Sequence, residues 1–357
     1  MEQNTNNHSL SGSPEPGISA RPNQLLAVID MGTNTFHLSI VSVSPAENLP
    51  ATSAGHKPTA PKFKSVYSEK TGVKLGEKGI NKGHITEAAI QRALDTMRKF
   101  AGIIKEHGLN PADTMATATS AVRCAENGKD FCSRIFAETG ISVNVIGGNE
   151  EATLIYEGVK AAGGLNTESY SLLMDIGGGS VEFIIGNQAG PVWMQSFEIG
   201  CLRLVDLFVQ HDPILPEEIG ALHTHALNML QPMFDAAKAC LPRTLAGSSG
   251  TFDTLYEMYA KALPENKGSF SFEAGNCYAL PVEAYRPLAH DILHKNREDR
   301  LAMPGMIPLR VDLAVPAVCL IDLVLAELPF PGGILVSTYA LKEGVLTRAL
   351  ADSARTK

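Results

Sequence analysis

Residues 172–186, LLMDIGGGSVEFIIG, constrain the fold more than any other part of the sequence. An apolar strand, a turn of three glycines and a second apolar strand follow one another, and Asp175 ends the first strand. Glycines adopt positive φ and bring backbone N–H groups together, which suits phosphate oxygens. An aspartate beside such a turn is placed to hold a divalent cation. The alternative is an ordinary glycine-rich hairpin with a solvated aspartate.

The same pattern occurs a second time near the N-terminus. Residues 25–43, LLAVIDMGTNTFHLSIVSV, contain an apolar strand, Asp30, a short turn and another apolar strand. Helical and strand patterns alternate after each hairpin. This arrangement predicts an α/β fold built from a duplicated unit, with a cleft between the two copies. Two hairpins that face each other would grip a phosphate chain and one cation between them.

Composition limits the classes of protein to consider. The 357 residues, 44% of them hydrophobic, suffice for two cores of ordinary domain size. The net charge of −8 provides no basic field for nucleic acid, so any polyanion must be bound locally. Six scattered cysteines without a CxxC motif favour the reducing cytoplasm. The most apolar run, residues 313–328, contains two acids and a proline and is too short for a membrane span.

The expected organisation is two domains after a tail. Residues 1–23 are polar, without the apolar centre of a signal peptide, and are predicted to be a disordered tail. Residues 24–153 form the predicted first domain and residues 154–337 the second. A final helix over about 338–352 is expected to pack back onto the first domain. Residues 44–62, rich in proline and alanine, are predicted to be a loop or insertion.

Three helices carry specific expectations. Thr86 is a predicted N-cap for an amphipathic helix that ends at Glu106. Asn149 is the expected cap of a helix whose first turn holds Glu150 and Glu151. A long apolar helix is predicted over residues 309–328.

Seven motifs, in one order along residues 24–351, resemble the exopolyphosphatase / guanosine pentaphosphate phosphohydrolase (Ppx/GppA) family in its short two-domain form. That family belongs to the actin-like ATPase and sugar kinase superfamily. Thr33 and Thr35 stand where serines are usual in the family, and they keep the hydroxyl groups. The motifs are DMGTNTFHL (30–38), ATSAVRCAEN (118–127), GNEEA (148–152), DIGGGSVE (175–182), GCLRL (200–204), GSSGT (247–251) and ALKEGVL (340–346).

The resemblance implies two ribonuclease H-like domains of the actin-like type, with the active site in the cleft between them. It implies an exopolyphosphatase that uses Mg²⁺, or Mn²⁺, to hydrolyse the terminal phosphoanhydride of inorganic polyphosphate. Guanosine pentaphosphate is the alternative substrate. An ATP-dependent kinase of the same superfamily and a non-catalytic polyphosphate or alarmone sensor are remoter alternatives. A homodimer is a family-level expectation.

Hydrolysis of a phosphoanhydride needs a cradle for oxygens, a cation, and a group that positions water. Asp175, with Asp30 as second candidate, is expected to hold the Mg²⁺. By resemblance, residues 247–251 lie near the nucleoside or the distal phosphates; they are equally suited to cap the next helix. The predicted phosphate-binding residues are Gly32, Thr33, Asn34, Thr35, Gly177, Gly178, Gly179, Ser180, Ser249, Gly250 and Thr251.

The resemblance assigns the attacking water to Glu151. A position in the first turn of a helix stabilises the anion and lowers its basicity, whereas substrate phosphates would oppose that effect. Arg123 is the predicted partner of a substrate phosphate, because a guanidinium fork matches two phosphate oxygens. Arg203 and Lys74 are weaker candidates. For each of these side chains a purely structural or solvated role is the alternative.

Several other motifs are excluded. The sequence contains no Walker A lysine motif, and GSSGT lacks the final glycine of GxSxG. His290 and His294 are one helical turn apart, but Asp291 stands where a zinc protease needs glutamate. His37 is predicted to be a strand or core histidine.

Overall fold

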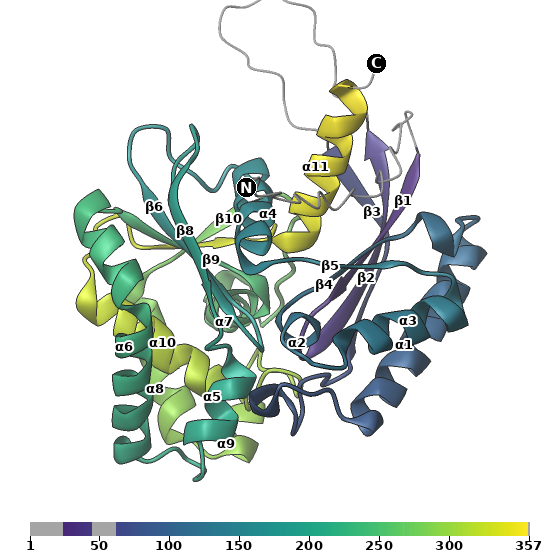
Figure 1. Ribbon diagram of the computed structural model, residues 1–357. Helices are drawn as coiled ribbons and strands as arrows, with labels where there is room; N and C mark the ends of the chain where they lie inside the picture. The colour runs from purple at the N-terminus through teal and green to yellow at the C-terminus, as the bar shows by residue number, and fades with distance from the viewer. Residues whose placement is uncertain (1–23, 45–61, 267, 356–357) are drawn as a thin grey trace, which may run out of the picture.

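Two mixed β-sheets, each covered by helices, form the two halves of the molecule (Figure 1). The computed structural model describes residues 24–44, 62–266 and 268–355. The predicted tail and almost all of the predicted insertion therefore lie outside the described residues.

The first half contains a five-stranded sheet in the order β3-β2-β1-β4-β5. One face packs against α1 (Glu87–Glu106) and α3 (Gly128–Thr139) around a core that includes Phe36 and Phe100. The hydroxyl of Thr86 accepts a hydrogen bond from the N–H of Ala89 at 3.3 Å, which confirms the predicted N-cap. The strands are β1 (Leu25–Met31), β2 (Thr35–Ser44), β3 (Lys62–Gly72), β4 (Met115–Ala118) and β5 (Val143–Val145).

The second half contains a six-stranded sheet in the order β10-β11-β9-β6-β7-β8. Its larger core lies between one face of this sheet and the helices that pack on it. The strands are β6 (Ser171–Ile176), β7 (Val181–Gly186), β8 (Pro191–Phe197), β9 (Thr244–Ser248), β10 (Cys277–Leu280) and β11 (Ile334–Ser337). The helices of this half are α5 (Cys201–Phe208), α6 (Pro216–Cys240), α7 (Ser249–Ala262), α8 (Val282–His294), α9 (Arg297–Leu301) and α10 (Ala314–Glu327).

The predicted duplication is confirmed by strand pairing. In the first half, β1 pairs antiparallel with β2 and parallel with β4, which pairs parallel with β5. In the second half, β6 pairs antiparallel with β7 and parallel with β9, which pairs parallel with β11. Strand β10 is an addition at one edge. The α/β fold of two ribonuclease H-like, actin-like halves is therefore confirmed.

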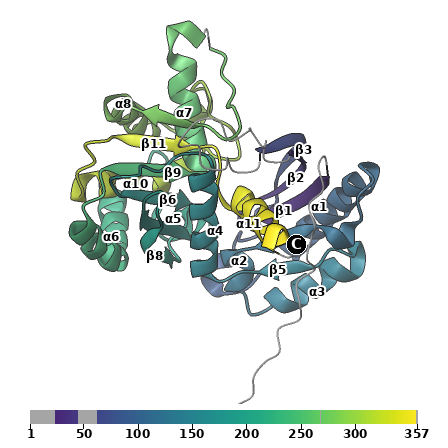
Figure 2. The ribbon, with the colours of Figure 1, turned by 90° about the horizontal axis from the view of Figure 1, so that it is seen from above.

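Two helices cross between the halves. Helix α4 (Gly148–Ala161) follows the first sheet but packs on the second, where Ile155 contacts the cluster around Leu173. Helix α11 (Leu341–Arg355) ends the second half, and its Leu346 and Leu350 pack against β1 and β2. The two helices lie side by side in Figure 2. The predicted domain boundary after residue 153 falls inside α4, which is one continuous helix.

Two predicted helix starts are wrong. Helix α4 begins at Gly148 with Gly147 as its N-cap, so Asn149 lies inside the helix. The apolar helix α10 begins at Ala314, because residues 309–313 form turns in which the N–H of Arg310 bonds to the carbonyl of Ile307. Helix α10 then accommodates Pro316 in its first turn, where a proline needs no N–H partner.

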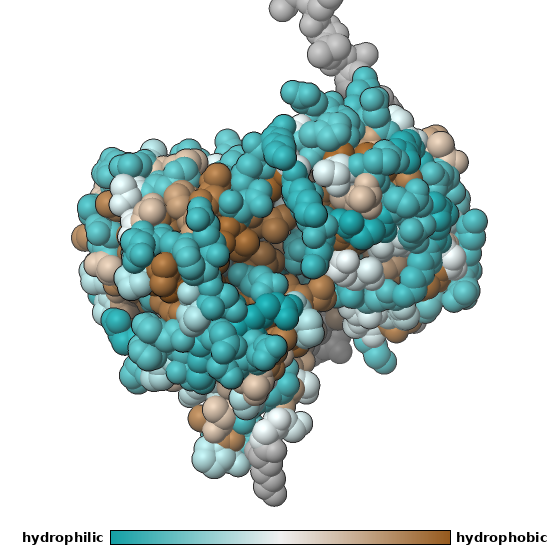
Figure 3. Space-filling view, turned by 90° about the horizontal axis from the view of Figure 1, so that it is seen from below, coloured by the Kyte–Doolittle hydropathy of each residue, from teal (hydrophilic) through white to brown (hydrophobic). Residues whose placement is uncertain are grey.

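Most of the face that Figure 3 shows from below is hydrophilic, with apolar residues gathered toward the middle of the left half. Large apolar side chains that are well exposed occur singly on several elements, for example Phe136 on α3 and Leu207 on α5. Within residues 24–44, 62–266 and 268–355, no helix is long and apolar enough to cross a membrane.

The crossing of α4 and α11 yields a stability prediction. A Cβ atom on Gly344 would lie 1.8 Å from the carbonyl oxygen of Leu154. Gly344→Ala should therefore lower the free energy of unfolding by about 2 kcal/mol, measured by denaturant titration. Gly102→Ala on α1, where the new Cβ has no atom of the described residues within 4 Å apart from the adjacent backbone of its own helix, should raise it by about 0.5–1 kcal/mol. Equal stability of the two variants would contradict the close packing of the helices.

Candidate active site

The two glycine-containing turns are equivalent in structure. The N–H of Gly32 donates to the carbonyl of Thr35 at 3.1 Å, and the N–H of Gly177 donates to the carbonyl of Ser180 at 3.0 Å. Each turn begins two residues after an aspartate, Asp30 in one half and Asp175 in the other. The duplication therefore extends to the hydrogen bond that closes each turn.

The two turns pack directly against each other. A Cβ atom on Gly178 would lie 3.2 Å from the Cβ of Thr33, and one on Gly179 would lie 2.5 Å from both Thr33 Oγ1 and Ser120 Oγ. Side chains at these positions would push the halves apart. The structure thus brings the predicted phosphate-binding turns together, with hydroxyl groups at the contact.

The start of helix α5 fixes the triple-glycine turn. The backbone N–H groups of Gly200, Cys201 and Leu202 donate to the three glycine carbonyls at 2.8–3.1 Å. A Cβ atom on Gly200 would lie 2.4 Å from backbone atoms of Gly179. This close approach explains why the GCLRL motif begins with glycine.

Asp30 and Asp175 are each the second-last residue of the first strand of their half, β1 and β6. The carboxylate of Asp175 is buried and accepts hydrogen bonds from Ser248 Oγ at 2.6 Å and Ser249 Oγ at 2.8 Å. Burial raises the pKa of Asp175, although these hydroxyl groups oppose the shift. Burial, followed by the negative charge of Asp175, raises the pKa of Asp30 to about 7. The two carboxylates thus repel each other in a site with little water.

This pair of aspartates fits a divalent cation. Mg²⁺ takes oxygen ligands, and proteins hold it with one or two carboxylates plus water and substrate phosphates. Among the residues that the structure describes, no group of three His, Cys, Asp or Glu side chains could hold a metal ion. An ion between Asp30 and Asp175 would therefore depend on phosphate and water for its remaining ligands.

The GSSGT residues lie at the carboxylate of Asp175. Ser249 is the first residue of α7 rather than part of a loop, and its φ of 68° turns the chain from β9 into the helix. Gly250 leaves room for the guanidinium of Arg310, which a Cβ would approach to 1.7 Å. Thr251 is buried in the helix. The described structure therefore places Ser249 beside the predicted metal ligand.

Glu151 is buried in the first turn of α4, with 6% of its surface exposed. Its Oε2 lies 2.8 Å from Nη1 of Arg123. Burial raises the pKa of Glu151 to about 8, although the hydrogen bond and charge of Arg123 oppose the shift. Burial and the charges of Asp175 and Asp30 therefore act against the effect expected from the helix start, and the pKa of Glu151 rises.

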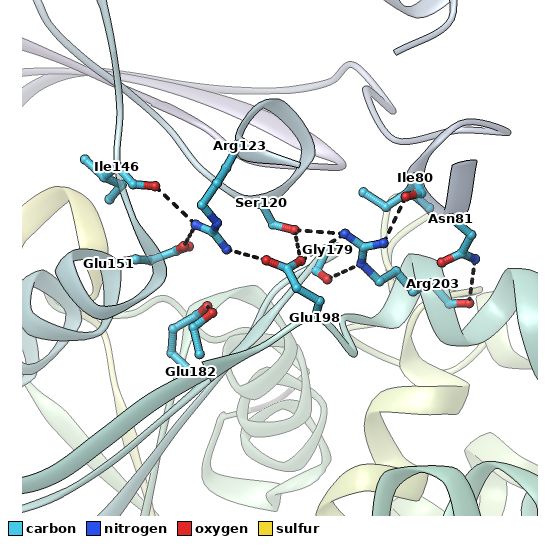
Figure 4. Close-up of polar contacts among 11 residues, drawn as sticks. Ile80, Asn81, Ser120, Arg123, Ile146, Glu151, Gly179, Glu182, Glu198 and Arg203 are labelled. Carbon is cyan, nitrogen blue, oxygen red and sulfur yellow. Dashed lines mark hydrogen bonds and ion pairs between the residues drawn. The ribbon is translucent and has the colours of Figure 1, made fainter. Parts of the chain in front are cut away.

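Arg123 divides its guanidinium between two acids. Nη1 bonds to Glu151, and Nη2 lies 2.8 Å from Oε1 of Glu198 (Figure 4). The other oxygen of Glu198 accepts from Arg203 Nη2 at 2.9 Å and from Ser120 Oγ at 2.5 Å. Arg203 also donates to the carbonyl of Gly179 at 2.8 Å. Of the two weaker candidates, Arg203 is at the site, whereas the side chain of Lys74 is exposed.

Sequence reasoning missed Glu182, which Figure 4 shows pointing toward Glu151. It is 1% exposed and accepts a hydrogen bond from Ser196 Oγ at 2.6 Å. Burial and the charges of Glu151 and Asp175 raise its pKa well above the ordinary value. The available signal was an acid within the otherwise apolar strand VEFIIG, whose residues are all buried.

Three cations near the aspartates were also missed. Lys70 and Lys342 lie close enough to lower the pKa of Asp30, and the charge of Arg310 lowers that of Asp175. These cations come from β3, α11 and the segment before α10, so their proximity depends on the fold. Burial, with Lys342 and Lys70 as further causes, lowers the pKa of the strand residue His37 to about 2, so this side chain is neutral.

Comparison with known proteins shows to which family the chain belongs. The sequence model of the Ppx/GppA phosphatase family matches residues 52–353. The chain belongs to this family. The crystal structure of an exopolyphosphatase from Cytophaga hutchinsonii is 42% identical, with a TM-score of 0.82, and the match covers 92% of this chain and 98% of that one.

Two curated relatives differ in how far they match. Exopolyphosphatase 1 of Mycobacterium tuberculosis is 28% identical over 330 residues, which are 92% of this chain and 89% of that protein. The bifunctional 3-dehydroquinate synthase/phosphatase of Fusobacterium nucleatum is 34% identical over 187 residues, 52% of this chain but only 26% of that protein. The family assignment identifies this Ppx/GppA member as a phosphatase by fold and motifs.

The raised pKa of Glu151 predicts pH-dependent stability in metal-free protein. The unfolded chain loses this proton near pH 4.5 and the folded chain near pH 8. The stability that proton binding confers is complete below pH 4.5 and is lost as the pH rises toward 8. Glu151→Gln, which cannot ionise, should gain about 1–3 kcal/mol relative to wild type between pH 5 and pH 8.

Thermal or denaturant unfolding at both pH values measures this difference. Glu150→Gln is the matched control, since the neighbouring Glu150 side chain is 45% exposed. A constant difference between Glu151→Gln and wild type across this range would show that Glu151 does not hold a proton in the folded state.

Proposed function

We propose that this Ppx/GppA family member is an exopolyphosphatase, which hydrolyses the terminal phosphoanhydride bond of inorganic polyphosphate and releases orthophosphate. The direct contact between its two equivalent turns, with an aspartate at the end of the strand before each, carries the proposal. Such paired turns offer amide and hydroxyl donors from two sides to one phosphoryl group. The relatives named exopolyphosphatase support polyphosphate as the substrate.

Binding of the substrate relies on local positive charge in an acidic protein. Thr33 Oγ1 and Ser120 Oγ meet at Gly179 and would donate to oxygens of the terminal phosphate. The ammonium groups of Lys70 and Lys342 lie near Asp30 and would neutralise the following phosphates. These contacts replace the overall basic charge that the chain lacks.

The metal would be held by Asp175 and Asp30. A bound Mg²⁺ or Mn²⁺ would supply positive charge to the phosphate oxygens as negative charge develops on them. The hydroxyl groups of Ser248 and Ser249 orient the Asp175 carboxylate, and Oδ1, which has only Ser249 as a hydrogen-bond partner among the described residues, keeps a lone pair for another partner. The repulsion between the two aspartates would be relieved by the cation.

Glu151 would accept the proton of the attacking water. A general base is most effective when its pKa lies near the working pH, and burial places Glu151 in that range. The hydrogen bond from Arg123 holds the carboxylate in one orientation at 2.8 Å. The negative charges of Asp175 and Asp30 add to this rise in the pKa of Glu151.

Phosphate release from long-chain polyphosphate with Mg²⁺ tests the proposal, with guanosine pentaphosphate and ATP assayed in parallel. Glu151→Gln should reduce kcat by about 10²- to 10⁴-fold, because the water loses its proton acceptor. Glu150→Gln should keep wild-type activity. Hydrolysis of guanosine pentaphosphate but not of polyphosphate would show that guanosine pentaphosphate is the substrate. A requirement for ATP together with a molecule that accepts its phosphate would indicate a kinase. Binding without release from any substrate would indicate a sensor.

Metal titration tests the aspartates separately. Asp175→Asn should raise the Mg²⁺ concentration for half-maximal activity by about tenfold or more, since an amide binds the ion more weakly than a carboxylate. Calorimetry with Mn²⁺ should show the same loss of affinity. Asp291→Asn, a change at an exposed residue of α8, serves as the control. Unchanged metal affinity in Asp175→Asn would contradict the assignment.

A further inference from the structure

Glu198 occupies an anion site at the seam between the two halves. Both of its carboxylate oxygens are bound: Oε1 lies 2.8 Å from Arg123, and Oε2 lies 2.9 Å from Arg203 and 2.5 Å from Ser120 Oγ. Two guanidinium groups and a hydroxyl group around one small anion are the donors that proteins use to bind phosphate.

The two arginines are less exposed than the acid that they bind. The side chains of Arg123 and Arg203 are 18% and 11% exposed, while that of Glu198 is 36% exposed. Glu198 therefore lies at the open side of the site, and the arginines line its inner wall. An anion that arrives from solvent meets Glu198 first.

The site adjoins the phosphate-binding turns. Arg203 Nε donates to the carbonyl of Gly179, so this arginine is anchored to the triple-glycine turn. Ser120 Oγ, which donates to Glu198, is also the atom that a Cβ on Gly179 would approach to 2.5 Å. One hydroxyl group therefore separates the carboxylate of Glu198 from the predicted cradle.

The carboxylate is charged at neutral pH. Burial acts to raise the pKa of Glu198, but hydrogen bonds from Ser120 and Arg123 outweigh it and hold the pKa below the ordinary value. A negative charge thus stays next to a site that must receive a polyanion, and it engages an arm of Arg123 that a phosphate would otherwise use.

We propose that Arg123, Arg203 and Ser120 form a phosphate subsite for the substrate, which Glu198 fills until a substrate phosphate displaces it. This inference rests on the proposed function in assigning a condensed phosphate as the ligand. Glu198 is then a resident substitute for the substrate anion, which keeps the arginines ordered and the halves joined in the absence of substrate. When a substrate phosphate displaces Glu198, the guanidinium groups of Arg123 and Arg203 stay paired with an anion. The negative charge of Glu198 then no longer lies in the path of the polyphosphate.

Isothermal titration calorimetry with inorganic tripolyphosphate, on the full chain in buffer with EDTA, tests the subsite without turnover. Glu198→Gln has the same shape without the charge and should bind tripolyphosphate about five- to tenfold more tightly than wild type, because no like charge competes for the arginines. Glu198→Asp keeps the charge on a shorter side chain, and its affinity should lie between the two.

The control is Glu87→Gln, which removes a carboxylate held at 2.8 Å and 3.0 Å by Arg134 on an exposed surface. Its affinity should equal that of wild type. If Glu198 only braces Arg123 and Arg203 for binding, both Glu198 variants should bind tripolyphosphate more weakly. Unchanged or weaker binding by Glu198→Gln would overturn the inference.

The outcome is separable from that of the proposed function. The wild-type protein could release phosphate from polyphosphate while Glu198→Gln binds tripolyphosphate no more tightly than wild type. This result would support the exopolyphosphatase and contradict the displacement of Glu198. Tighter binding by Glu198→Gln in a protein that releases no phosphate would keep the subsite and reject the hydrolase.

Discussion

The close approach of two backbone turns is the constraint on which the rest of the structure depends. Gly178 and Gly179 bring the second turn against Thr33, and a Cβ atom on Gly179 would lie only 2.5 Å from the Thr33 hydroxyl. That contact joins the two sheets at the ends of their first strands. It thereby places Asp30 opposite Asp175, and it opens the site to donors from both halves.

The cost of this arrangement is electrostatic. Burial raises the pKa of Asp30, Asp175, Glu151 and Glu182, and the charges of neighbouring acids add to the rise at all of them except Asp175. Arg123 compensates only part of this charge. A bound cation and positively charged side chains along the path of the substrate therefore complete the site. The residues that would hold the cation and those that would bind the substrate come from distant parts of the sequence.

Helices α4 and α11 keep this geometry in place. Each follows one half and packs on the sheet of the other, and Gly158 and Gly344 allow their backbones to meet. A Cβ atom on Gly158 would lie 2.1 Å from the carbonyl oxygen of Ala340. Because α4 also carries Glu151, the packing of the two halves and the position of this carboxylate are linked.

Much of the fold could be predicted from local pattern. The hairpins and the Thr86 cap follow from periodicity and capping chemistry, which act over a few residues. The start of α10 could not be predicted in this way, because the turns between residues 309 and 313 depend on contacts such as that of Leu309 with Gly72. The raised basicity of Glu151 also escaped prediction, since it depends on burial rather than on position in a helix.

The sequence by itself determined the duplicated strand-turn-strand units, their aspartates and the residues of both turns, because each is encoded within about 20 consecutive residues. Only the tertiary structure decided which charges meet. Glu182 faces Glu151, Glu198 joins Arg123 to Arg203, and Lys70 and Lys342 approach Asp30 from two separate elements. Electrostatic interactions depend on distance in space and on exclusion of water, and neither quantity is contained in the local order of residues.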